Sequence, residues 1–149
     1  MENLRELYQQ VILDHNKDPK NFGDLEHCTH HAEGRNPVCG DHYIVKMLIE
    51  DTLIKDIHYQ GSGCAISKSS GSLMTSMLKG KTEKEALELF DVFQKLVTSS
   101  IESEVDKEKL GKLSVFAGVR EFPARVKCAS LVWHAMKAAI ERGRDVTTE

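Results

Sequence analysis

The sequence has no long apolar run and no excess of charge of one sign. Its 149 residues carry 20 Lys and Arg against 23 Asp and Glu, and this balance argues against a strongly basic nucleic-acid-binding surface. No apolar stretch approaches the roughly 18 residues of a membrane-spanning helix, and the charged N-terminus is unlike a signal peptide. We therefore expect one globular domain over residues 1–149, located in the cytoplasm, with no nucleic-acid or membrane partner.

The four cysteines form no Cys-x-x-Cys pair, so their spacing gives no support to a zinc ribbon or a thioredoxin-like redox motif. In a reducing cytoplasm we expect thiols or metal ligands rather than disulfides. Cys39, Cys64 and Cys128 each stand where the backbone is expected to turn, before a strand or near the start of a helix. Cys28 has no Gly or acidic neighbour and is expected to be a small buried apolar residue.

Hydrophobic periodicity predicts helices on both sides of a β-hairpin. The hairpin alternates apolar and polar residues from Tyr43 to Tyr59, turns at Asp51-Thr52, and is preceded by a short strand around residues 28–33. Three later helices are expected. The first covers residues 64–78, the second begins at a capping box formed by Thr82 and Glu85, and the third runs from Pro123 to Gly143. The charged segment from Glu102 to Gly118 has only a short helical turn at Leu110 and Leu113. This order predicts an α+β fold of two layers.

The three junction cysteines suggest a shared chemistry. A thiol near a helix N-terminus is favoured as a thiolate by the helix dipole, and Arg125 acts in the same direction on Cys128. If the three thiols converge, Asp41 adds an oxygen ligand two residues from Cys39. Such a set suits tetrahedral zinc and also iron in a sulfide cluster. From spacing alone, separate buried cysteines explain the pattern about as well as a metal site does.

Three motifs carry a resemblance to a known family. They are Asn36-Pro37-x-Cys39-Gly40-Asp41, Gly61-x-Gly63-Cys64-Ala65-Ile66-Ser67 and Pro123-Ala124-Arg125-x-Lys127-Cys128-Ala129. Over residues 4–142 the chain resembles the IscU/NifU N-terminal family of iron–sulfur cluster assembly proteins. The resemblance implies a small three-stranded antiparallel sheet packed against several α-helices. It also implies a metal held by Cys39, Asp41, Cys64 and Cys128.

Two departures resemble the SufU-type branch of that family. Cys64 and Cys128 are 64 positions apart, which implies an insertion at about 102–118, and Lys127 stands where scaffold members typically carry histidine. A SufU-type member is implied to bind Zn²⁺ and to accept persulfide sulfur on Cys39 from a SufS-like cysteine desulfurase. Arg125 would support the reaction. The sulfur would pass to a downstream assembly scaffold or to apo-proteins, which makes the chain a sulfurtransferase-type relay.

Two alternatives remain open at this point. The same four ligands would serve a scaffold that transiently assembles and transfers a [2Fe–2S] cluster, with iron in place of zinc. A Cys-His hydrolase built on Cys64 and a distant histidine is a third interpretation, but it explains neither Asp41 nor the other two cysteines.

Overall fold

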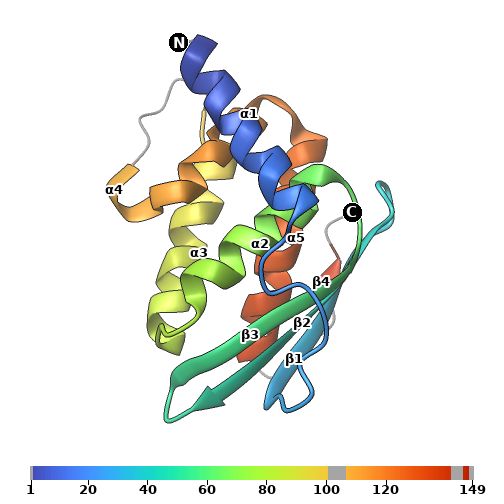
Figure 1. Ribbon diagram of the computed structural model, residues 1–149, viewed down its shortest axis with the longest axis vertical. Helices are drawn as coiled ribbons and strands as arrows, with labels where there is room; N and C mark the ends of the chain where they lie inside the picture. Colours follow the sequence, from blue (N-terminus) through green and yellow to red (C-terminus); the bar gives the residue numbers. More distant parts are fainter. Residues whose placement is uncertain (1, 101–106, 142–145, 148–149) are drawn as a thin grey trace.

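The computed structural model describes residues 2–100, 107–141 and 146–147, and shows helices gathered over one face of a sheet (Figure 1). The elements in chain order are α1 (Glu2–Lys17), β1 (His30–Asn36), β2 (Asp41–Glu50), β3 (Leu53–Ser62), α2 (Ala65–Leu78), α3 (Glu83–Thr98), α4 (Lys107–Leu110), the 3₁₀ helix η1 (Gly111–Glu121), α5 (Pro123–Ile140) and β4 (Val146–Thr147). In these ranges no helix has the length and apolar character needed to cross a membrane. The predicted α+β fold is confirmed.

The strands of the described residues follow the order β3-β2-β1-β4. β1 pairs with β2 and β2 with β3, both antiparallel, as the resemblance implied. The predicted turn at Asp51 and Thr52 is present, with positive φ at both residues, as tight two-residue hairpin turns require. The two-residue β4, which no sequence signal indicated, adds a parallel pairing to β1 at Gly34 and Arg35.

Strand β1 differs from the expectation of a strand around residues 28–33, because it begins at His30 and continues to Asn36. Its inward positions are the small or polar residues Ala32, Gly34 and Asn36, so it lacks the apolar alternation that usually marks a strand. A Cβ atom on Gly34 would lie only 3.0 Å from Cδ1 of Leu131, so glycine lets this strand approach α5 closely. The helix therefore supplies the apolar surface that the strand sequence lacks.

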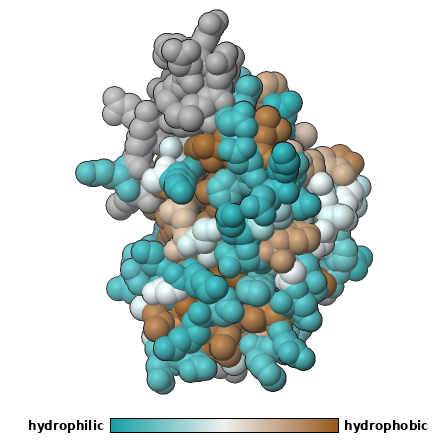
Figure 2. Space-filling model, in the orientation of Figure 1, coloured by the Kyte–Doolittle hydropathy of each residue, from teal (hydrophilic) through white to brown (hydrophobic). Residues whose placement is uncertain are grey.

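Helix α5 packs against the sheet and connects the core to the other helices. Trp133 is fully buried and stacks on Phe93 of α3 with ring centroids 4.7 Å apart. Its indole N–H donates to Ser70 Oγ of α2 at 3.1 Å. One side chain thus links three helices. The face in Figure 2 is largely hydrophilic, with hydrophobic side chains in small separate patches, as expected when the apolar side of each helix is buried.

The segment between α3 and the end of α5 contains the expected insertion and the last predicted helix. The expected insertion lies partly outside the described residues, and from Lys107 onward it forms α4 and η1. Leu110 and Leu113, predicted for a short helical turn, are buried there. Pro123 occupies the first turn of α5 as predicted, whereas the helix ends at Ile140 and the expected end at Gly143 lies outside the described residues.

Candidate metal centre

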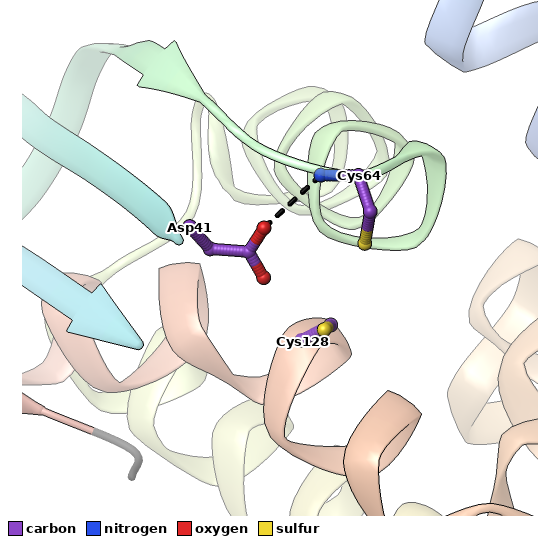
Figure 3. Close-up of side chains that lie close together, drawn as sticks. All are labelled: Asp41, Cys64 and Cys128. Carbon is purple, nitrogen blue, oxygen red and sulfur yellow. Dashed lines mark hydrogen bonds between the residues drawn. The ribbon is translucent and has the colours of Figure 1, made fainter. Parts of the chain in front are cut away.

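Three segments that are distant in sequence meet at one end of the sheet (Figure 3). Asp41 opens β2, Cys64 lies between β3 and α2, and Cys128 lies in the second turn of α5. One carboxylate oxygen and the two Sγ atoms all lie within 4.8 Å of one another. Each side chain is fixed by a different element, so the group is a product of the tertiary fold.

Cys64 is the N-cap of α2. Its Sγ accepts a hydrogen bond from the backbone N–H of Ser67 at 3.5 Å. This bond satisfies one of the backbone N–H groups that are left without a partner at the start of a helix. The backbone N–H of Cys64 donates to Asp41 Oδ1 at 3.0 Å, so the backbone of one candidate ligand orients the side chain of another.

Asp41 is only 2% exposed, and its second oxygen, Oδ2, is buried without a hydrogen-bond partner among the described residues. Burying a carboxylate oxygen without a hydrogen-bond partner costs free energy, unless a cation or a hydrogen-bond donor binds to that oxygen. In Figure 3 this carboxylate is directed toward Cys64 and Cys128. One oxygen and two sulfur donors suit a borderline-soft divalent ion such as zinc, so these residues fit a metal.

Cys128 is almost completely buried. Burial raises the pKa of its thiol, and the neighbouring Asp41 and Cys64 raise it further, because a thiolate there would be a buried negative charge beside other acids. A divalent cation offsets these charges and allows such a thiol to ionise. The electrostatics of the group therefore favour occupation by a cation.

Cys39 lies outside this three-residue group, in the turn between β1 and β2. The backbone N–H groups of Cys39 and Gly40 both donate to the carbonyl of Asn36, at 3.2 and 2.8 Å. Gly40 has a φ of 76°, which a residue with a side chain rarely adopts. Cys39 is exposed, yet its thiol lies close enough to Cys128 to contribute to the raised pKa of that buried thiol. The fourth predicted ligand thus stands at the solvent edge of the group.

Arg125 is exposed in the first turn of α5, and its guanidinium lies 4.4 Å from the ring centroid of Phe122. Cys28, expected to be buried, is half-buried in the loop before β1 and also lies outside the group. Two polar residues to which the sequence analysis gave no role in the site lie beside Cys64. The Tyr43 hydroxyl and Ser67 Oγ are 3.1 Å apart, and burial raises the pKa of Tyr43 to about 12.

Comparison with known proteins adds independent information. Residues 7–141 match the family model of the NifU-like N terminal domain. The iron–sulfur cluster assembly scaffold protein IscU of Streptococcus pyogenes serotype M1 is 40% identical over 139 residues, which are 93% of this chain and 86% of that protein. The zinc-dependent sulfurtransferase SufU of Bacillus subtilis is 36% identical over 140 residues, 94% of this chain and 93% of that one.

A solved structure shows the same fold. It is described as a "putative iron-sulfur cluster assembly scaffold protein for SUF system" from Fervidobacterium islandicum AW-1. The two structures superpose with a TM-score of 0.81 at 34% identity, covering 88% of this chain and 94% of that one. The family match over residues 7–141 includes all three segments that meet at the candidate centre.

Proposed function

The chain belongs to the NifU-like N-terminal domain family of iron–sulfur cluster assembly proteins, and from this premise we propose that it is a zinc-dependent sulfur acceptor. In this proposal Cys39 takes persulfide sulfur from a SufS-like cysteine desulfurase and passes it to a downstream assembly scaffold or apo-protein. Cys39 and Cys64 are both exposed, whereas Asp41 and Cys128 beside them are buried. The main support for Cys39 as the acceptor is that it stands in a short turn, while Cys64 is held as the N-cap of α2 by the backbone N–H of Ser67. The reaction needs reduced thiols and so fits the cytoplasm.

The proposed ligands are Asp41, Cys64 and Cys128, completed by Cys39. Zinc bound there would keep the thiols deprotonated at neutral pH. The side chains of Asp41 and Cys128 are enclosed by the fold, and Cys64 is held by the N-terminus of α2. Cys64 is exposed as Cys39 is, but Cys39 is carried by a short turn and not by a helix terminus, so it is the exposed sulfur better able to turn toward a second protein.

The proposed transfer is a thiol–persulfide exchange. The Cys39 thiolate attacks the terminal sulfur of the donor's persulfide, a new S–S bond forms on Cys39, and the S–S bond of the donor breaks. The donor cysteine leaves as a thiolate, and any proton on the persulfide stays with the transferred sulfur. No external oxidant or reductant is consumed. The exposed turn then leaves the new persulfide accessible to the next acceptor.

Arg125 has a supporting role in this proposal. Its guanidinium is permanently charged and lies on the exposed first turn of α5, the helix that carries Cys128. It is suited to stabilise the persulfide anion or a carboxylate of the partner, because both are negatively charged and accept hydrogen bonds from a guanidinium fork.

The test uses a desulfurase, radiolabelled cysteine and the zinc-loaded protein, with label on the chain measured under non-reducing conditions. Cys39→Ala should retain label only at background level. Cys28→Ala is the matched control, because this half-buried cysteine lies outside the candidate group, and it should accept sulfur as the wild type does. Equal labelling of Cys39→Ala and the wild type would refute the assignment.

A cluster scaffold is the second candidate, and the 40% identity to a protein named as an IscU scaffold favours it. The same four ligands would hold a transient [2Fe–2S] cluster, with iron as the metal. Anaerobic reconstitution, Mössbauer spectroscopy and transfer to an apo-ferredoxin distinguish the two proposals. One tightly held zinc and no transferable cluster would reject the scaffold.

A further inference from the structure

Two buried hydroxyl groups lie directly behind the candidate metal centre. Tyr43 on β2 and Ser67 on α2 are both fully buried, and their oxygens are 3.1 Å apart. Ser67 Oγ donates to the carbonyl of Cys64 at 3.0 Å and lies 3.7 Å from Cys64 Sγ. This pair therefore joins the inner face of the sheet to the cysteine that begins α2.

The hydrogen bonds in this pair have a defined direction. A serine hydroxyl has one proton, and that of Ser67 is directed to the Cys64 carbonyl. The Tyr43 hydroxyl must then be the donor to Ser67 Oγ. If the Cys64 thiol is ionised, its Sγ becomes a second acceptor for the Ser67 proton, and Tyr43 can donate to Ser67 Oγ in either orientation.

Gly63 provides separate evidence that these groups converge on the ligands. A Cβ atom on Gly63 would lie 2.5 Å from Asp41 Oδ1, 2.5 Å from Ser67 Oγ and 2.8 Å from the Tyr43 hydroxyl. One carboxylate and two hydroxyls thus surround a single backbone carbon, immediately before Cys64. Only the absence of a side chain at this position lets all three approach.

We propose that Tyr43 and Ser67 are positioning residues of the metal centre: they fix the orientation of Cys64 and thereby raise the affinity of the site for zinc. Groups that hydrogen-bond to metal ligands typically change metal affinity by about 10–100-fold when removed. The inference rests on the proposed metal centre and is independent of whether sulfur transfer occurs there.

The experiment measures zinc affinity of the metal-free protein by competition with a chromophoric chelator. Tyr43→Phe keeps the buried ring and removes the hydroxyl, and it should weaken zinc binding about tenfold. Ser67→Ala should weaken it at least as much. The double variant should bind no more weakly than Ser67→Ala alone, because Tyr43 acts through Ser67. In the Co²⁺-substituted protein, both single variants should shift the thiolate-to-metal charge-transfer absorption.

Tyr59→Phe is the matched control. Tyr59 is equally buried and its hydroxyl donates to the Lys68 carbonyl of the same helix at 2.6 Å, but this bond does not involve a candidate ligand. Tyr59→Phe should reduce unfolding stability and keep wild-type zinc affinity. The inference is wrong if Tyr43→Phe binds zinc as the wild type does, or if Tyr59→Phe loses as much affinity.

The outcomes also separate this inference from the proposed function. If the wild-type protein shows no specific zinc binding, the metal centre is refuted together with the roles of Tyr43 and Ser67. If zinc binding and its dependence on Tyr43 are as expected while Cys39→Ala still accepts sulfur, only the sulfur-acceptor proposal fails.

Discussion

Replacement of Gly63 by alanine is a direct test of how the candidate centre is assembled. The new Cβ would lie 2.5 Å from both Asp41 Oδ1 and Ser67 Oγ, well inside the ordinary contact distance of about 3.5–4.0 Å. One or both side chains must therefore move. Displacement of Asp41 breaks the 3.0 Å hydrogen bond from the Cys64 N–H, which aligns the two candidate ligands.

The size of the effect follows from that bond. A hydrogen bond to a charged group contributes about 1.5–3 kcal/mol, so we expect the unfolding free energy of metal-free Gly63→Ala to fall by about 2 kcal/mol. Misalignment of the ligands should lower zinc affinity about 10–100-fold, which is the usual effect of removing a group that hydrogen-bonds to a metal ligand. Urea unfolding and chelator competition measure the two quantities separately.

Gly71→Ala is the control for steric crowding without involvement of the ligands. Gly71 lies in α2, the helix that Cys64 caps. A Cβ atom on Gly71 would lie 2.4 Å from Cε2 of the Tyr59 ring. This variant should lose unfolding stability and keep wild-type zinc affinity. Our account of the centre is refuted if Gly63→Ala binds zinc normally, or if Gly71→Ala weakens zinc binding to the same degree.

Three further changes have defined outcomes. Arg125→Ala removes no ligand, so sulfur acceptance from the desulfurase should slow while zinc affinity in chelator competition stays at the wild-type value; a parallel loss of both would contradict its role. Ser70→Ala leaves the buried Trp133 N–H without its acceptor and should cost about 1–3 kcal/mol in urea unfolding, whereas unchanged stability would contradict this. Burial lowers the pKa of His134, so below pH 6.5 the unfolded chain binds the proton more readily and stability falls with acidification, by up to about 1.4 kcal/mol per pH unit. His134→Gln should reduce that slope in urea titrations, leaving the part due to His15, whose pKa burial also lowers, and an unchanged slope would exclude His134 as a cause.

The features that the sequence predicted correctly depend on neighbours within a few residues. The capping box at the start of α3 is one, with Glu85 N–H donating to Thr82 Oγ1 at 3.1 Å and Thr82 N–H to Glu85 Oε1 at 3.0 Å. The start of α2 directly after Cys64 is another, because the glycines before it interrupt the strand. Such signals are local in the chain, so no tertiary information is needed to find them.

The features that the sequence did not predict depend on distant partners. Strand β1 has inward positions without large apolar side chains, and its burial comes from the close approach of Leu131 on α5 to Gly34. The Tyr43–Ser67 pair joins residues 24 positions apart, and Tyr43 has the periodicity of an ordinary apolar strand residue. The motifs suggested which residues form a metal centre, but the exposure of Cys39 and Cys64 beside the buried Asp41 and Cys128 follows from where the fold places each segment.

Exposure and local anchoring together determine which ligand is best suited to exchange in the proposed function. Asp41 and Cys128 are 2% and 4% exposed, so withdrawing either from a metal would leave a buried charge without compensation. Cys64 is exposed, but it is held in place by the N-terminus of α2 and by its backbone hydrogen bond to Asp41. Cys39 can turn into water, where a thiolate is well solvated. Three thiolates and a carboxylate also carry more negative charge than one divalent ion offsets, which favours release of the exposed ligand that no helix terminus holds. The sulfur that would leave a bound metal most easily is thus also exposed to a donor protein approaching from solvent.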